Sequence, residues 1–185
     1  MRTMILCLGH EGLWSDDIAA RVGRVLKALP LPSPMTVRIV SRLDWDSVDA
    51  IADCEQTIVV DAMDSGGEPG TCFVEEAPHD ASLTFRLYCR HRQMVNDIVE
   101  LGRLSAMEGS RKRLVFIGVE VGGERWDESY SDADSDSAWA VPLAVDSVLR
   151  SFGAEVALRT MVSRACARIE SADGAAASWQ YQGAA

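Results

Sequence analysis

The sequence predicts a three-layer α/β fold, in which a mainly parallel, twisted sheet of about five strands lies between two layers of helices. Short apolar runs rich in β-branched residues alternate with longer segments of helical periodicity over most of the chain. The 185 residues suit one domain, and 48% of them are hydrophobic, which is enough for a core. Such alternation favours right-handed crossovers and a parallel sheet covered on both faces.

The expected strands are short and mostly apolar. We assign them to residues 4–8, 36–40, 57–60, 71–74 and 114–119. Residues 64–70 read Asp-Ser-Gly-Gly-Glu-Pro-Gly, a composition typical of a turn. Residues 83–90 favour neither helix nor strand.

The expected helices carry most of their apolar residues at helical spacing. We assign them to residues 17–29, 45–54, 91–104, 138–152 and 156–169. Ser15 and Asp16 offer N-caps for the first of these helices. The domain we expect covers residues 1–153, followed by a C-terminal helical extension over 154–172. The tail over 173–185 is rich in Gly, Ala and Ser, and we expect it to be disordered.

Charge and composition narrow the classes of function. The formal net charge is −10, which argues against binding DNA or RNA, because phosphate contacts need clustered Lys and Arg. No run approaches the ~20 apolar residues of a membrane span, and the N-terminal apolar run is too short for a signal peptide. The five cysteines are widely spaced, as in a reduced cytosolic protein. We therefore expect a cytoplasmic protein that binds neither nucleic acid nor membrane.

Acidic residues follow two of the expected strands, at the sheet edge where α/β proteins carry their sites. Asp16 and Asp17 come shortly after the strand 4–8, and Asp61 directly follows the strand 57–60. Asp16 and Asp17 also suit helix capping, which contributes roughly 0.3–1 kcal/mol. Asp61 also suits a turn. However, a carboxylate beside apolar core needs a partner, because an unpaired buried charge is costly.

The three histidines differ in their surroundings. His79 lies in a polar loop and is expected to be exposed, His10 follows the first strand, and His91 begins the helix 91–104. A lone histidine is more often a surface or core residue than a ligand. Two carboxylates and an imidazole that met at one sheet edge would suit zinc, nickel or cadmium, with a coordination position open for substrate. The sequence leaves open whether they meet.

Motifs of several other enzyme classes are missing. The glycines at positions 66, 67 and 70 fit neither the dinucleotide-binding loop nor the Walker phosphate loop. The chain has no GxSxG nucleophile elbow, no HExxH zinc motif and no CxxC pair. Nucleotide binding and elbow-type hydrolysis are therefore poorly supported.

Three segments resemble the hydrogenase maturation endopeptidases. Residues 4–22, MILCLGHEGLWSDDIAARV, are similar to the family's first strand, Gly-Asn loop and paired acids. Residues 58–71, IVVDAMDSGGEPGT, are very similar to its Asp-Ala pair and Gly-x-x-Pro-Gly-Thr turn, and are the most specific of the three. Residues 91–104, HRQMVNDIVELGRL, are similar to the helix that its histidine begins. The resemblance extends over about residues 4–152.

The resemblance implies an endopeptidase that acts on the large-subunit precursor of a [NiFe] hydrogenase. Such an enzyme recognises the nickel-loaded precursor and removes its C-terminal extension. In the family, nickel is held by the second acid of the first motif, the Asp of the second and the His of the third. Carried over by position, the metal ligands are Asp17, Asp61 and His91, with Asp17 and Asp61 as the catalytic carboxylates.

The resemblance also leaves alternatives. Nickel is expected to arrive with the substrate, while another divalent metal in the isolated protein is the alternative. Hydrolysis is expected through nickel-assisted attack by water, with Asp17 or Asp61 shared between metal and water, or through one carboxylate as general base. A monomer is expected for a protein that docks on one large partner. The alternative function is a chaperone of the same fold that binds the nickel-loaded subunit without cutting it.

The chain departs from the family pattern at several places. The residues expected to surround the ligands are His10, Asp16 and Asp64. His10 stands where the family has Asn. The loop from Gly9 to the paired acids is one residue longer than usual, so either Asp16 or Asp17 could be the metal ligand, and the phase of the helix favours Asp17. Glu120 replaces the usual Gln after the last strand, and the acidic loop 122–136 is unlike a typical member.

Overall fold

The structure, a computed structural model, describes residues 2–10, 17–31, 34–68, 70–77, 88–107, 112–121 and 140–150. In chain order its elements are β1 (Thr3–Leu8), α1 (Asp17–Lys27), β2 (Met35–Val40), α2 (Trp45–Ala52), β3 (Gln56–Met63), β4 (Cys72–Ala77), α3 (Arg92–Met107), β5 (Arg113–Glu120) and α5 (Ala140–Arg150). The predicted acidic loop, the helix 156–169 and the tail lie outside these residues. No helix within the described ranges is long and apolar enough to cross a membrane.

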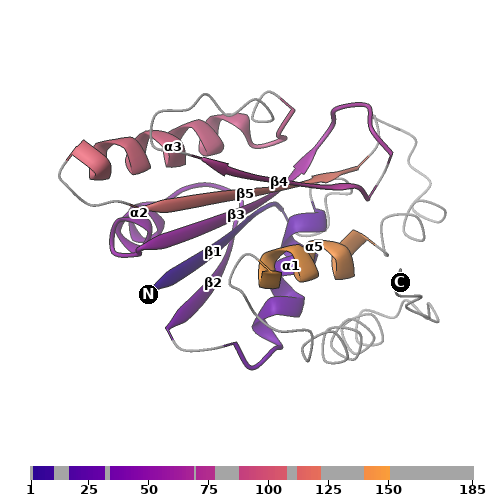
Figure 1. Cartoon of the computed structure of the whole chain (residues 1–185), viewed down its shortest axis with the longest axis horizontal. Helices are drawn as coiled ribbons and strands as arrows, with labels where there is room; N and C mark the ends of the chain where they lie inside the picture. Colours follow the sequence, from indigo (N-terminus) through magenta and orange to yellow (C-terminus); the bar gives the residue numbers. More distant parts are fainter. Residues whose placement is uncertain are drawn as a thin grey trace.

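The five strands form one sheet in the order β2-β1-β3-β5-β4. β1 runs parallel to β2 and β3, and β3 runs parallel to β5, whereas β4 is antiparallel to β5 at the edge of the sheet. Figure 1 shows α3 on one side of the sheet and α1 with α5 on the other. The predicted three-layer α/β fold with a mainly parallel sheet is therefore confirmed.

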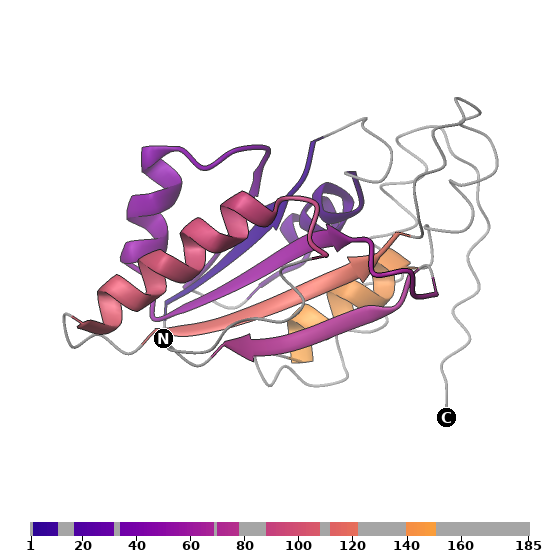
Figure 2. The ribbon, with the colours of Figure 1, turned by 90° about the horizontal axis from the view of Figure 1, so that it is seen from above.

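Two apolar cores hold the helices to the sheet, because successive strand residues face opposite sides. Val60 and Ile117 belong to the core that α1 and α5 cover, while Val59 and Phe116 belong to the core that α2 and α3 cover. Figure 2 shows the strands running between α3 and α5. Asp61, two residues beyond Val59, therefore faces the side of α2 and α3.

β3 continues further than the sequence predicts. The expected strand ended at residue 60 with Asp61 just beyond it, but β3 runs to Met63. The reason is that its last residues keep strand partners: Asp61 is level with Gly118 of β5, and Met63 forms a bridge with Cys89. Asp61 is thus a residue of a paired strand rather than the first residue of a loop.

Candidate active site

The carboxyl end of β3 lies beside the segment that leads into α3. Arg90 N–H donates to the carbonyl oxygen of Ala62 at 2.9 Å, and Asp64 N–H donates to that of Tyr88 at 3.0 Å. These two hydrogen bonds join segments that are some 25 residues apart in the chain. They fix the start of α3 against the strand and bring His91 next to it.

Asp61 and His91 are in direct contact at two points. The backbone N–H of His91 donates to Oδ2 of Asp61 at 3.0 Å, and the ring Nδ1 lies 2.8 Å from Oδ1. The side chain of Asp61 is 2% exposed and that of His91 is 14% exposed, so the imidazole lies between the buried carboxylate and the surface. Because Nδ1 contacts Asp61, Nε2 is the ring nitrogen through which His91 would bind a metal or exchange a proton.

The surroundings of Asp61 change its acidity. Burial raises the pKa of Asp61 above its ordinary value, and the hydrogen bonds and charge of His91 offset part of that rise. The first turn of α3 also favours a negative charge at this place, because helix N-termini carry partial positive charge. A carboxylate with a raised pKa is a stronger proton acceptor than an ordinary aspartate, which suits general-base chemistry.

Cys89 lies beside the same carboxylate. Its side chain is 6% exposed, and burial, together with the negative charge of Asp61 and a hydrogen bond to it, raises the pKa of the Cys89 thiol. A thiol in such surroundings stays protonated, and the thiolate is the reactive form. Cys89 is therefore a neutral neighbour of Asp61 rather than a nucleophile.

The surface is hollowed where the pair approaches it. The hollow has a volume of about 520 Å³. It is lined by the residues at the start of α3, namely Cys89, Arg90, His91, Arg92, Gln93 and Met94. His91 therefore lines a surface hollow together with two arginines, Arg90 and Arg92.

Asp17, the third predicted ligand, begins α1. α1 follows β1, the strand beside β3, so Asp17 belongs to a connection at the same carboxyl end of the sheet. Its Oδ2 lies 3.7 Å from a guanidinium nitrogen of Arg24, and its side chain is 22% exposed. Among the described residues, no three or more His, Cys, Asp or Glu side chains are arranged to hold a metal ion. The structure thus joins Asp61 to His91 without adding Asp17 as a third ligand.

Two of the remaining predicted residues follow strands at this edge of the sheet. His10 is exposed just beyond β1, and Asp64 is half-buried just beyond β3. Asp16 and His79 lie outside the described residues. An imidazole beside a carboxylate suits nickel or zinc in chemical type, so the donor pair fits the predicted metal, and the full nickel site stays a prediction.

Glu120 is a second buried acid at this edge and was not among the predicted site residues. It is 1% exposed and accepts hydrogen bonds from the N–H of Ser65 at 2.9 Å and from its hydroxyl. Gly70 N–H donates to the backbone oxygen of Glu120 at 2.6 Å. Glu120 therefore anchors the turn after β3. The sequence signal for this role was an acidic residue at the end of an apolar strand, because a buried acid needs hydrogen-bond partners.

Solved structures with this fold include several hydrogenase maturation endopeptidases. An endopeptidase from Escherichia coli is 20% identical, with 84% of this chain and 96% of that chain covered and a TM-score of 0.64. The hydrogenase maturating endopeptidase HybD from E. coli is 16% identical, with 82% and 91% covered and a TM-score of 0.57. The [NiFe] hydrogenase maturation protease HybD from Thermococcus kodakarensis is 21% identical, with 81% and 98% covered and a TM-score of 0.52.

These similarities concern the fold, over about four-fifths of the chain. No protein-family model matches the sequence, and no curated protein sequence matches it. What the comparisons establish for this chain is therefore a fold that it shares with these solved structures.

Proposed function

We propose that this chain is an endopeptidase of [NiFe] hydrogenase maturation. It recognises the nickel-loaded precursor of the large subunit and removes the C-terminal extension, in the cytoplasm and as a monomer. The observation that carries the proposal is the contact between Asp61 and His91, at 2.8 and 3.0 Å. These two residues come from the two segments that resemble the Asp and His motifs of the family. The fold shared with solved maturation endopeptidases supports the same function.

The two residues have different proposed roles: His91 is a metal ligand and Asp61 is a general base. Asp61 holds the imidazole through Nδ1 and so fixes Nε2 as the nitrogen for nickel carried by the substrate. Nickel held there would supply Lewis-acid polarisation of the scissile carbonyl. Asp61, with its raised pKa, would accept the proton of the attacking water once the His91 ring has turned away from Oδ1, because in the present arrangement both carboxylate oxygens contact His91. Direct ligation by Oδ1 of Asp61 requires the His91 ring to turn away from it, and Asp17 is the further carboxylate ligand.

Incubation of the purified protein with the large-subunit precursor, loaded with nickel or left empty, tests the proposal. We expect the nickel-loaded precursor to lose the mass of its C-terminal extension and the empty precursor to keep its mass. Stable association without loss of mass would instead identify the chaperone. A precursor that is neither bound nor cut would contradict both functions.

A further inference from the structure

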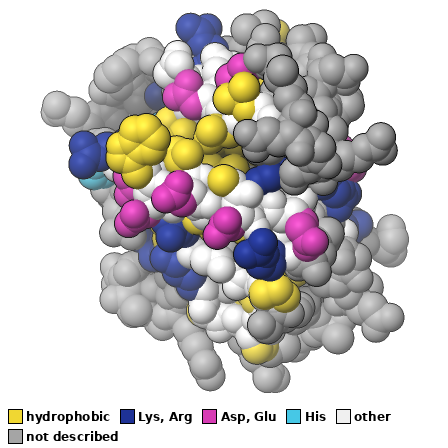
Figure 3. All heavy atoms as spheres, turned by 90° about the vertical axis from the view of Figure 1, so that its left-hand side faces the viewer, with side chains coloured by type: hydrophobic (Ala, Val, Ile, Leu, Met, Phe, Trp, Pro, Cys, Tyr) yellow, Lys and Arg dark blue, Asp and Glu magenta, His cyan; other side chains and the backbone are white. Residues whose placement is uncertain are grey.

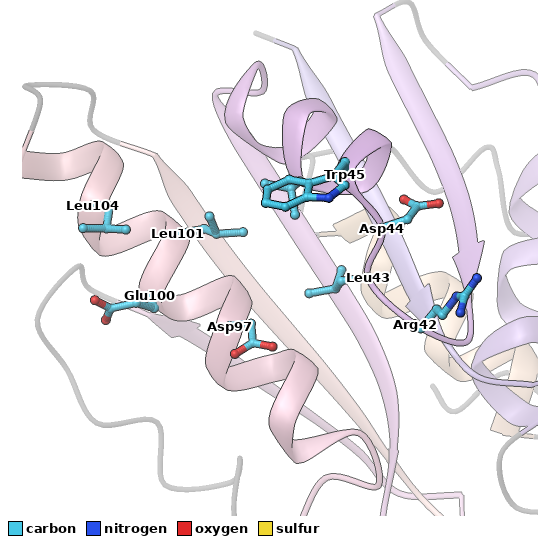
Figure 4. A pocket seen from close by; sticks show the side chains of 9 residues that line it. Arg42, Leu43, Asp44, Trp45, Asp97, Glu100, Leu101 and Leu104 are labelled. Atoms are coloured by element: carbon cyan, nitrogen blue, oxygen red, sulfur yellow. The ribbon is translucent and has the colours of Figure 1, made fainter.

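A groove separate from the candidate active site runs between α2 and α3 (Figure 4). Its volume is about 620 Å³. The apolar residues that line it are Leu43, Trp45, Val48, Leu101 and Leu104. Trp45 is 82% exposed and Leu104 is 48% exposed. Exposed tryptophan beside other apolar groups is the composition of a protein-binding surface, because burying it on a partner yields a large gain in free energy.

The border of the groove is mostly acidic. Its charged lining residues are three carboxylates, Asp44, Asp97 and Glu100, and one guanidinium, Arg42. Asp44 accepts a hydrogen bond from Ser47 N–H at 2.8 Å, which lowers the pKa of Asp44 and keeps it charged. Figure 3 shows acidic side chains along the border of an apolar patch on the α2 side of the molecule. The charge therefore favours an occupant that carries Lys or Arg.

The shape of the groove favours a protein segment over a small molecule. Sites for small ligands enclose most of the ligand surface. Here the largest lining side chain, Trp45, is 82% exposed, so the groove is open to solvent on the side of this residue. An amphipathic helix, with its apolar face between α2 and α3 and its basic residues over the acidic border, fits both the shape and the charge.

The groove and the active site share one helix. His91 precedes the first residue of α3, and Asp97 and Leu104 lie six and thirteen residues further along the chain. At 1.5 Å per residue, these positions are roughly 9 and 20 Å from His91. One protein substrate spans this distance easily, with the cleaved segment at His91 and another segment in the groove.

We infer that the groove between α2 and α3 is a docking site for a basic, amphipathic segment of the substrate protein. The inference rests on the proposed function, since it takes the substrate to be the hydrogenase precursor. Docking there holds the precursor while its extension lies at Asp61 and His91. The groove thus contributes affinity and selectivity rather than chemistry.

Binding of the nickel-loaded precursor tests the inference when every variant is made in the Asp61→Asn background and compared with Asp61→Asn alone, because this background is expected not to cut and any effect of Asp61 on binding is common to all the proteins compared. We expect Trp45→Ala to weaken binding by about 10- to 30-fold. Val74→Ala, which alters an exposed residue of β4 outside the groove, should bind normally. Glu100→Lys should weaken binding and reduce its salt dependence. Asp53→Lys makes the same change of charge at the C-cap of α2, and it should alter neither the affinity nor its salt dependence.

The same substitutions in the active protein separate docking from chemistry. Trp45→Ala should raise KM for the precursor by a similar factor and leave kcat unchanged. If the protein cuts the precursor but Trp45→Ala and Glu100→Lys bind like their controls, the docking site is wrong and the proposed function stands. If the precursor is neither bound nor cut, the proposed function fails. Dimers of the protein alone that Trp45→Ala dissociates would identify a second copy as the occupant and overturn the inference.

Discussion

The two carboxylate oxygens of Asp61 both contact one residue, His91: Oδ2 accepts a hydrogen bond from its backbone N–H at 3.0 Å, and Oδ1 lies 2.8 Å from its ring Nδ1. This arrangement fixes the imidazole in position and orientation at once. It depends on the pairing of the segment before α3 with the end of β3, where Arg90 N–H donates to the oxygen of Ala62 at 2.9 Å. The geometry of the site is therefore set by backbone structure and not by side-chain packing alone.

Asp61→Asn is predicted to change how stability depends on pH. Because burial raises the pKa of Asp61 in the folded protein, its contribution to stability is full below the ordinary value of 3.8 and is lost as the pH rises through the raised value. Asn does not ionise, so the variant should gain stability relative to the wild type between pH 3 and pH 7. Urea unfolding of both metal-free proteins across this range measures the difference. If the wild type instead gains stability relative to the variant as the pH rises, the interaction with His91 lowers the pKa of Asp61 by more than burial raises it.

Glu120→Ala is predicted to release the turn after β3. It removes the acceptor of the Ser65 N–H and hydroxyl, and a lost hydrogen bond to a charged group costs about 1.5–3 kcal/mol. Glu120→Gln keeps one acceptor oxygen and should lose less than half as much. Chemical denaturation gives both values. Equal stability of all three proteins would show that the turn does not depend on this carboxylate.

Gly118→Ala is predicted to disturb the strand beside Asp61. A Cβ at position 118 would meet the buried Met63 side chain, with Sδ closest and Cγ at 3.3 Å. Overpacking of this kind costs about 1–3 kcal/mol. Met63→Val shortens the obstructing side chain, so the double variant should lose less stability than the sum of the single variants. Strict additivity would argue against the close approach of Gly118 and Met63.

The thiol of Cys72 is predicted to react slowly with iodoacetamide. Burial raises the pKa of Cys72 from 9.0 to about 11, so at pH 8 its thiolate fraction falls about a hundredfold. Its contribution to stability is full below pH 9 and is lost as the pH rises towards 11. Mass spectrometry of the folded protein should find Cys72 largely unmodified, and unfolding in urea should restore an ordinary rate. An ordinary rate in the folded protein would contradict the raised pKa.

The sequence predicted most of the fold because local patterns determine it. The apolar spacing of residues 17–29 and 91–104 identified α1 and α3, and β-branched runs identified the parallel strands. The antiparallel direction of β4 was not predicted, because it depends on pairing with β5, about forty residues away. For the same reason the true end of β3 was missed, since Met63 pairs with Cys89.

The site was predicted in part. Asp61 was expected to need a partner because it follows an apolar run, and the family resemblance, not the local pattern, indicated His91. Glu120 was missed as part of the site, because its contacts with Ser65 join residues 55 positions apart. The role of Asp17 as a nickel ligand stays a prediction, as the structure places its Oδ2 beside the guanidinium group of Arg24.

The most direct measurement is the intact mass of a nickel-loaded [NiFe] hydrogenase precursor after incubation with the wild-type protein, Asp61→Asn and His91→Ala. We predict that the wild type removes the C-terminal extension and that Asp61→Asn does so at least ~100-fold more slowly, the usual scale for losing a group in proton transfer. His91→Ala should also cut more slowly, because it removes the imidazole that would hold the nickel of the substrate. Circular dichroism shows whether the variants are folded. Full cleavage by the folded Asp61→Asn variant would contradict the central role of the Asp61–His91 pair.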